Sequence, residues 1–273
     1  MVGTLKVQRH RDHGWPVILI RGLEGGAWVW PRTFAQLQRS HVVYAVTLAG
    51  FDGVPAPSDG GNLFDRADAP LLQRSRQDRI DKPALVGHSR DGTLALSFAG
   101  ERAERISGVV AVDGLPIFPG MERISVEQRR TMAAQMQQQI SVAIPKQVET
   151  QVLHYMQHVG LVDQQLAARH APMNSRSDIK PIEEYMVGDL GFDGRPGLKH
   201  ASVPILEISP YCAPDFSKPD MAMSEAQKAA YCQSPLANVS NAKVVSIASS
   251  RHYVMLDQPL PFQQVLDGFL KSP

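Results

Sequence analysis

The sequence predicts an α/β fold with a mostly parallel sheet flanked by helices, and three patterns support this expectation. Short, continuous apolar runs recur along the chain, as in strands that are buried on both faces of a parallel sheet. Helix-compatible segments separate these runs, which is the alternation of a doubly wound sheet. One longer helical stretch interrupts the alternation, which then resumes and completes the sheet.

Six apolar runs are the expected strands. The second run is rich in β-branched residues, which favour an extended backbone, and Pro or Gly borders the first and the third. The chain length suits one large α/β domain or two smaller ones. The expected strands cover residues 17–20, 42–46, 84–86, 106–112, 203–208 and 244–248.

The expected core helices lie between and after these strands. The segment 66–80 is the least regular of them, because the charged run RSRQDR breaks its apolar stripe. The five helices cover residues 27–39, 66–80, 90–100, 224–238 and 259–270.

Residues 115–199 are expected to form a helical insertion in this alternation. Ser125 and Gln128 have the spacing of a capping box at the start of a helix. Pro145 fits the first turn of a second helix, and Gly160 fits its end. Two shorter helices are predicted near residues 162–170 and 181–187, before a Gly-rich connector at residues 191–197.

Five apolar side chains are candidates for the wall of a binding site. Met132 and Met136 are one helical turn apart in the insertion, and Met156 lies on its next helix. Plain core packing is the ordinary role of such a stripe, and an adaptable apolar wall over a ligand is the alternative. Trp28 either lines the mouth of the pocket or anchors its helix, and Phe51, in a turn-rich loop at a strand end, is expected to shape the rim.

The charge balance indicates which partners to expect. The chain of 273 residues has 28 Lys and Arg against 27 Asp and Glu, which gives a formal net charge of +1. A near-neutral chain has no global field that would attract phosphate backbones or anionic membranes. We therefore expect no nucleic acid partner. The further expectations are a small-molecule substrate and a chain that is either a monomer or a homodimer.

The sequence also bears on location. No stretch approaches about 18 uninterrupted apolar residues, so membrane insertion is not expected. Residues 1–15 lack the apolar region of a signal peptide. This predicts a soluble, cytoplasmic protein, or a periplasmic or secreted one if a signal peptide was removed. Cys212 and Cys232 are expected to be free thiols, with a single disulfide bridge as the alternative.

Ser89 is the strongest candidate for chemistry. It lies in the segment 87–92, GHSRDG, directly after a predicted strand and before a predicted helix. A side chain at such a turn is exposed at the carboxyl end of the sheet, where open α/β sheets bind their ligands. The amide groups at the start of the helix favour a developing negative charge at the same place.

A serine nucleophile needs a general base, and His252 is the best candidate for this role. It follows a predicted strand, so it lies at the same edge of the sheet as Ser89. The acid that orients the histidine should also follow a strand. Asp215 is the first choice for this acid and Asp113 is the alternative, since each comes after a predicted strand.

Four motifs, taken in order, resemble the α/β-hydrolase superfamily, and the resemblance covers nearly the whole chain. They are the strand with Gly and Leu at 17–23, GHSxxG at 87–92, VVAVDGLP at 109–116 and SRHYVMLDQP at 250–259. Within the superfamily the chain resembles bacterial carboxylesterase-like serine hydrolases with a helical cap. The resemblance implies the α/β-hydrolase fold, with its core in residues 1–114 and 200–273 and its cap in residues 115–199.

The resemblance also implies an activity and a site. Ser89 would attack an ester carbonyl, His252 would take its proton, and Asp215 would orient His252. The backbone N–H groups of Leu23 and Arg90 would form the oxyanion hole. The product of the first step would be an acyl-enzyme, which water then hydrolyses.

Two positions depart from the superfamily pattern. Members often carry His-Gly after the first motif strand, where this chain has Arg21-Gly22. Asp91 replaces the closing Gly of the GxSxG turn, and a negative charge there would oppose a nearby oxyanion. Because both residues lie near the same strand ends, we expect an ion pair between Arg21 and Asp91 beside Ser89.

The sequence predicts an enzyme without cofactors. It contains no Walker-type loop and no GxGxxG, so a nucleotide cofactor is not expected. His154 and His158 have a spacing that can hold zinc, but the Glu of an HExxH motif is missing and no metal is expected. The primary expectation is a carboxylesterase or lipase acting on small to medium esters. The alternatives are a carbon–carbon bond hydrolase, a lactonase, a perhydrolase, or a weakly active or non-catalytic ligand-binding protein permitted by Asp91.

Overall fold

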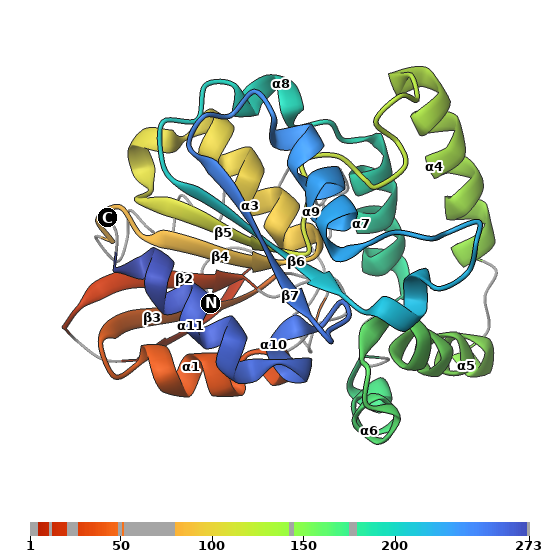
Figure 1. Ribbon diagram of the computed structural model, residues 1–273, viewed down its shortest axis with the longest axis horizontal. Coiled ribbons are helices and arrows are strands. Elements are labelled where there is room, and N and C mark those ends of the chain that lie inside the picture. The colour runs from red at the N-terminus through yellow and green to blue at the C-terminus, as the bar shows by residue number, and fades with distance from the viewer. Residues whose placement is uncertain are drawn as a thin grey trace.

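In the part of the chain that the structure describes, seven strands form one sheet in the order β1-β3-β2-β4-β5-β6-β7 (Figure 1). The computed structural model describes residues 5–10, 13–20, 27–48, 51, 80–141, 145–174 and 179–271. Its strands are β1 Leu5–His10, β2 Trp15–Ile20, β3 His41–Leu48, β4 Ala84–His88, β5 Gly108–Val112, β6 Ile205–Tyr211 and β7 Ala242–Ala248.

All six expected strands are present, and they run parallel to one another. The prediction of a mostly parallel α/β sheet is therefore confirmed. β1, which was not among the expected strands, pairs antiparallel with β3 at the edge of the sheet. In β1 apolar and polar residues alternate, as in LKVQRH, so it lacks the continuous apolar run of the inner strands.

Two layers of apolar side chains pack on the two faces of this sheet. Val17 and Leu19 of β2 belong to one cluster, and Ile18 and Ile20 belong to the other. This alternation is the two-residue period of a strand, with both faces buried. Each large side chain that is fully buried in this way stabilises the fold by about 1.5–3 kcal/mol.

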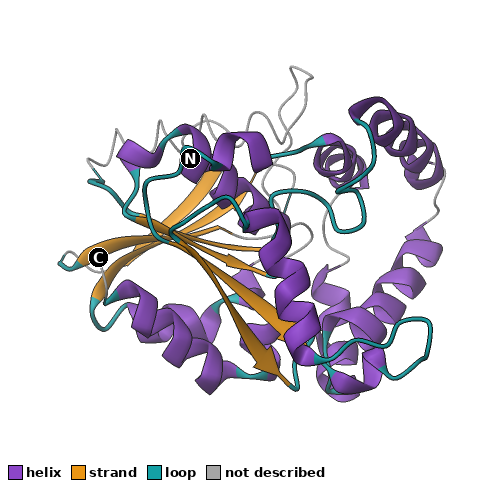
Figure 2. Cartoon of the chain, turned by 45° about the horizontal axis from the view of Figure 1, so that its top comes forward, coloured by secondary structure: helices purple, strands orange, loops and turns teal. Residues whose placement is uncertain are grey.

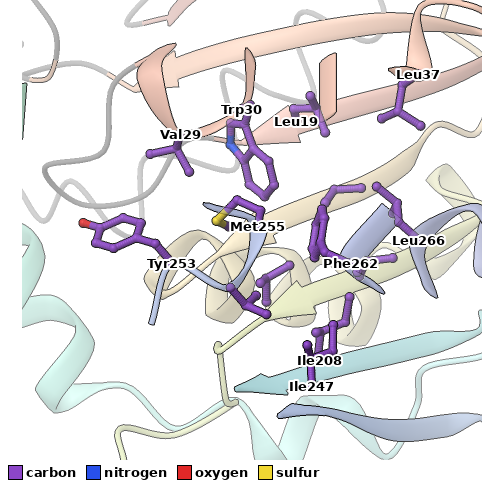
Figure 3. Packing of buried hydrophobic residues seen from close by; sticks show 14 of the residues in the cluster. Leu19, Val29, Trp30, Leu37, Ile208, Ile247, Tyr253, Met255, Phe262 and Leu266 are labelled. Carbon is purple, nitrogen blue, oxygen red and sulfur yellow. The ribbon is translucent and has the colours of Figure 1, made fainter. Parts of the chain in front are cut away.

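Helices cover both faces of the sheet (Figure 2). The first cluster contains Trp30, Leu37 from α1 and Phe262 from α11, and Figure 3 shows these side chains around Leu19. The second cluster contains side chains of α3 and α8. The core helices and short helical turns are Ala27–Val29, α1 Pro31–Leu37, α3 Arg90–Glu101, Ala103–Arg105, Ala213–Phe216, α9 Glu225–Gln233, Ser234–Leu236, α10 Val254–Asp257 and α11 Pro259–Leu270.

Between β5 and β6 the chain forms the predicted helical insertion. Figure 1 shows α4, α5 and α6 on one side of the molecule, with α5 and α6 nearest to the carboxyl ends of β6 and β7 and α4 packed against α7. Ser125 and Gln128 make both bonds of a capping box, at 3.2 Å each, immediately before α4. The elements are α4 Val126–Ser141, α5 Pro145–Tyr155, a π-helical turn Met156–Gly160, α6 Gln164–Asn174, α7 Ile179–Gly191 and α8 Arg195–Leu198.

Three further expectations concern one helix, the two cysteines and membrane insertion. The helix expected at 66–80 lies, apart from Ile80, outside the described residues. Cys212 and Cys232 are buried free thiols, so they form no disulfide bridge. Within the described ranges, no helix has the length and apolar character needed to cross a membrane.

Candidate active site

Ser89 lies at a sharp turn between β4 and α3. Its backbone has φ 56° and ψ −128°, a conformation that residues other than Gly rarely adopt. The N–H of Ser89 donates to the carbonyl of Val112 at the end of β5, over 2.8 Å. Gly87 is required by this turn, because a Cβ there would overlap the main-chain carbonyl of Asp91. The predicted strand–turn–helix context is therefore present, and Ser89 is partly exposed although the residues on either side of it are buried.

The side chain of His252 contacts the residue that follows β5, the strand next to β4. Its Nδ1 lies 2.6 Å from Oδ2 of Asp113, the residue that directly follows β5. Strands β4 and β5 are adjacent, with His88 opposite Val112. Ser89 and the Asp113–His252 pair therefore lie at adjoining strand ends on the carboxyl edge of the sheet.

The charge state of Asp113 suits it to orient the imidazole. Burial alone would raise the pKa of this carboxyl, but the hydrogen bond from His252 and the nearby charges of His252 and Lys228 hold its pKa below the ordinary value. A carboxylate can only accept hydrogen bonds, so Nδ1 of His252 carries the hydrogen. In the neutral form of the ring, the Nε2 atom is then left as a proton acceptor.

The structure gives Asp215 a different partner from the one expected. Its two carboxylate oxygens accept from Arg251, at 2.8 Å from Nε and 2.5 Å from Nη2. The expectation that Asp215 orients His252 is thus not supported by the contacts, and the alternative, Asp113, makes the bond instead. The physical reason is competition: the guanidinium next to His252 in the chain binds the Asp215 carboxylate at both of its oxygens.

His88 contacts His252, the candidate general base. Its ring centroid lies 4.4 Å from that of His252, and its Nε2 lies 2.9 Å from the main-chain oxygen of His252. Burial, together with the nearby charge of His252, lowers the pKa of His88 to about 3, so its ring is neutral. Because a carbonyl only accepts, Nε2 of His88 carries the hydrogen and anchors the backbone of His252.

A buried polar cluster lies behind Asp113, and no sequence motif indicated it. Lys228 Nζ lies 3.9 Å from Oδ1 of Asp113, 3.3 Å from the hydroxyl of Ser209 and 3.4 Å from the thiol of Cys232. Glu207 on β6 has no exposed surface, and its burial raises its pKa well above the ordinary value. The neutral form of Glu207 is favoured, so Lys228 and Asp113 are the opposite charges of this cluster.

Asp91 is buried rather than exposed beside Ser89. Only 1% of its surface is accessible, and burial raises its pKa well above the ordinary value against the opposing charge of Arg90. The raised pKa weakens the negative charge that the sequence analysis expected near the oxyanion. Arg21 and Leu23 lie outside the described residues, so the expected Arg21–Asp91 ion pair and one half of the expected oxyanion hole lie there too.

Arg90, the residue after Ser89, connects the turn to the insertion. Its Nη1 donates to the carbonyl of Tyr185 on α7 over 3.0 Å. Its guanidinium carbon lies 4.3 Å from the centre of the Tyr185 ring, within the range of a cation–π contact. The residue whose N–H was expected in the oxyanion hole is therefore held by its side chain against α7.

The three candidate pocket methionines do not share one environment. Met156 has no exposed surface and packs in the core cluster that contains Trp30. Met132 on α4 is 40% exposed, and Met136, one turn later, is half-buried. Core packing explains Met156, whereas Met132 lies on the surface of the insertion.

The two candidate aromatic residues both pack against other rings. Trp28 stacks on His170 of α6 with ring centroids 4.7 Å apart, and it also contacts Tyr253 at 5.2 Å. Phe51 is buried in the core and contacts Tyr185 at 5.0 Å. Trp28 thus joins the insertion to the segment that carries His252.

The rings of His154 and His158 have centroids 4.3 Å apart. Among the residues that the structure describes, no group of three potential metal ligands forms around them or elsewhere.

Known proteins resemble this chain both in sequence and in fold. The family model described as the alpha/beta hydrolase family matches residues 13–264. Among solved structures, MenH from S. aureus superposes with a TM-score of 0.78 at 16% identity, covering 98% of this chain and 98% of that one. An esterase from Exiguobacterium antarcticum superposes with a TM-score of 0.78 at 15% identity, covering 98% and 96%.

The curated relatives match a smaller part of the chain. The 1-acylglycerol-3-phosphate O-acyltransferase ABHD5 of Rattus norvegicus is 27% identical over 125 residues, which is 44% of this chain and 36% of that protein. The chain thus matches only about a third of the length of this relative.

Proposed function

Since this chain belongs to the alpha/beta hydrolase family, we propose that it is a serine hydrolase of the carboxylesterase type, which cleaves small to medium carboxylic esters. The observation that carries the proposal is the strained turn at Ser89 next to the Asp113–His252 pair, joined at 2.6 Å. A hydroxyl, an imidazole and an ionised carboxylate at one sheet edge are the parts that acyl transfer requires.

In the proposed mechanism, Nε2 of His252 takes the hydroxyl proton as Ser89 attacks the ester carbonyl. Asp113 orients the ring and stabilises the imidazolium that forms. The imidazolium then gives its proton to the leaving alcohol, and an acyl-enzyme results. Water attacks this ester by the same steps, which release the acid and restore Ser89. No hydrogen bond joins Ser89 Oγ to the His252 ring in the described part of the chain, and we expect this bond to form with bound substrate.

The remaining parts of the site follow from the family. We assign the oxyanion hole to the backbone N–H groups of Arg90 and Leu23. We assign residues 1–114 and 200–273 to the catalytic core and residues 115–199 to a cap that covers the substrate. The position of α5 and α6 near the carboxyl ends of β6 and β7 supports this assignment (Figure 1). The solved esterase from Exiguobacterium antarcticum is consistent with the proposed reaction, although its likeness concerns the fold.

A fluorophosphonate probe tests the proposal directly, because it phosphonylates a serine activated by a neighbouring base. We expect the wild-type protein to be labelled at one site and Ser89→Ala to remain unlabelled. A panel of p-nitrophenyl esters of increasing chain length then gives the acyl preference. A wild-type protein that is neither labelled nor active on any ester would contradict the proposal and would favour a non-catalytic, ligand-binding role.

A further inference from the structure

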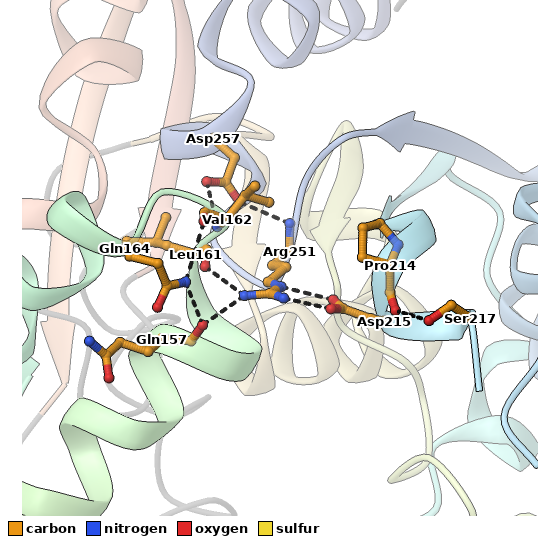
Figure 4. Close-up of polar contacts among 9 residues, drawn as sticks. All are labelled: Gln157, Leu161, Val162, Gln164, Pro214, Asp215, Ser217, Arg251 and Asp257. Atoms are coloured by element: carbon orange, nitrogen blue, oxygen red, sulfur yellow. Dashed lines mark hydrogen bonds and ion pairs between the residues drawn. The ribbon is translucent and has the colours of Figure 1, made fainter.

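The side chain of Arg251, the residue before His252, makes hydrogen bonds to two separate segments of the chain (Figure 4). Its Nε and Nη2 donate to Asp215, which follows β6. Its Nη1 donates to the main-chain oxygens of Gln157, at 2.7 Å, and Leu161, at 3.0 Å. Only 15% of the Arg251 side chain is exposed, so these contacts replace most of its hydration.

The acceptors in the insertion are carbonyl groups at the end of a helix. α5 passes into the π-helical turn Met156–Gly160, and Leu161 then adopts an extended backbone. The last carbonyls of a helix have no partner within it and must be satisfied from outside. The main chain of the histidine segment supplies further donors, with His252 N–H to Val159 O at 3.2 Å and Tyr253 N–H to Gly160 O at 3.0 Å.

Asp257 of α10 also links the histidine segment to the insertion. Its carboxylate accepts from the N–H of Arg251, at 2.9 Å, and from the N–H of Val162, at 3.0 Å. The segments 157–162 and 251–257 are therefore joined by main-chain and side-chain bonds on both sides of Arg251. Its hydrogen bonds to Asp215 raise the pKa of Arg251, so its charge is kept throughout the working range of pH.

These contacts bear on His252 from three directions. The ring is held by Asp113, the carbonyl oxygen by His88 and the N–H by Val159 of the insertion. Arg251 fixes the residue just before this one, and it does so against both Asp215 and the insertion. Without the guanidinium, this segment would lose its bonds to Asp215 and to the carbonyls of Gln157 and Leu161. It would then be held only by its main-chain bonds and by the contacts of the His252 ring.

We propose that Arg251 is a positioning residue for the hydrolysis. It holds His252 in line with Ser89 by clamping the π-helical turn after α5 to Asp215, which follows β6. This inference rests on the proposed function of Ser89 and His252. It assigns Asp215, the acid expected from the sequence, to the clamp. It also means that the insertion and the general base are held as one unit, although 90 residues separate Leu161 from Arg251.

The test compares Arg251→Met with a matched control, Arg195→Met. Arg195 makes the same kind of contacts elsewhere, with Nε and Nη2 on Asp193 at 2.9 and 2.7 Å and Nη1 on the carbonyl of Glu122 at 3.1 Å. For Arg251→Met we expect kcat on a short p-nitrophenyl ester to fall on the order of 10- to 100-fold, because a small misplacement of a reacting group has effects of this size. KM should stay within about threefold, and the rate constant of fluorophosphonate labelling should fall by the same factor as kcat.

The control and the conservative variant separate positioning from general loss of structure. Arg195→Met should keep wild-type kcat even if its Tm falls, and Arg251→Lys should recover part of the activity. If Arg251→Met does not fold, Asp215→Asn weakens the same clamp and should lower kcat in the same direction by a smaller factor. Wild-type kcat in the folded Arg251 and Asp215 variants, or a change confined to KM, would overturn the proposal.

A failure of the proposed function would look different. The wild-type protein would then show no labelling and no ester hydrolysis. In that case hydrogen exchange at the amides of His252 and Tyr253 measures the clamp by itself. Arg251→Met should accelerate hydrogen exchange at these two amides, and Arg195→Met should not. Equal exchange rates in the two variants would contradict the proposed role of Arg251 in holding this segment.

Discussion

Strained backbone marks the edge of the sheet where the proposed chemistry takes place. Ser89, Asp113 and Ser249 have φ values of 56°, 48° and 54°, and they follow β4, β5 and β7. Such a conformation costs on the order of 1–3 kcal/mol in a residue other than Gly. Main-chain bonds from neighbouring strands offset this cost, with Ser89 N–H on Val112 O and Asp113 N–H on Ile208 O. The proposed nucleophile and acid are thus placed by the sheet itself.

Asp113→Asn should remove most ester hydrolysis, whereas Asp215→Asn should keep much more of it. An amide at position 113 can donate to Nδ1, which favours the ring tautomer with a hydrogen on Nε2 and leaves no base for Ser89. We expect kcat to fall on the order of 10³-fold or more for Asp113→Asn. Steady-state kinetics of the two variants, with circular dichroism as a check on folding, measures the difference. An Asp215→Asn enzyme with the larger loss would restore Asp215 as the acid.

The sequence could not decide whether Asp113 or Asp215 orients His252, and the reason is physical. Both carboxylates follow strands of the sheet, so their positions along the chain are equally suitable. What separates them is the guanidinium of Arg251, which binds Asp215 and leaves Asp113 to the imidazole. Ser89 and His252 could be predicted because each follows an apolar strand within a distinctive local motif. The hydrogen bond of His88 could not be predicted, because its acceptor, the carbonyl of His252, lies 164 residues away in the chain.

At the scale of elements, the continuous apolar run was the most reliable signal. It found the five inner strands, β2 to β6, because their side chains are buried on both faces of the sheet. It also found β7, the strand at the other edge, whose residues are mostly only partly buried. It missed β1, because a strand at the edge can alternate polar and apolar residues. The expected helix at 27–39 is divided into a short turn and α1, with Trp30 and Pro31 at the junction. Proline is favoured in the first turn of a helix, which explains why α1 begins there.

The turn between β4 and α3 depends on a glycine, and a pair of substitutions tests this. In Gly87→Ala the new Cβ would overlap the main-chain carbonyl of Asp91, which cannot move without displacing α3. In Gly268→Ala, near the end of α11, the new Cβ meets nothing within 4 Å. We expect Gly87→Ala to lower Tm markedly or to prevent folding, and Gly268→Ala to raise the free energy of unfolding by roughly 0.5–1 kcal/mol. Thermal and urea unfolding measure both; a Gly87→Ala protein with wild-type Tm would contradict the close approach.

At the scale of the whole molecule, a buried arginine at the start of α3 interacts electrostatically with a buried carboxyl group of the insertion. Arg90 begins α3 directly after Ser89, and Asp189 lies on α7 of the insertion. Burial raises the pKa of Asp189 to about 6, against the opposing charge of Arg90. The unfolded chain, by contrast, releases this proton near the ordinary carboxyl value of 3.8. The proton balance at this junction therefore affects how stability depends on pH.

The sign of this effect follows from the protons bound in each state. Below about pH 4 the carboxyl of Asp189 is protonated in both the folded and the unfolded chain, and it contributes nothing. Between about pH 4 and 6 the folded chain binds more protons than the unfolded chain, so the free energy of unfolding falls as the pH rises. Above pH 6 the loss is complete and constant. His88 acts in the opposite direction, because its lowered pKa, about 3, makes the folded chain bind fewer protons below about pH 6.5.

Asp189→Asn separates the contribution of Asp189 from that of His88, because the difference between variant and wild type cancels the groups they share. The variant should match the wild type near pH 4 and should be more stable by about 2–3 kcal/mol at pH 8, where the wild type holds an ionised buried carboxylate. Urea unfolding at intervals from pH 4 to pH 8 gives this difference directly. A difference that stays constant across the range would mean that Asp189 does not titrate between these values. A difference that grows as the pH falls would reverse the sign, and would mean that Arg90 stabilises the ionised form of Asp189 by more than burial opposes it.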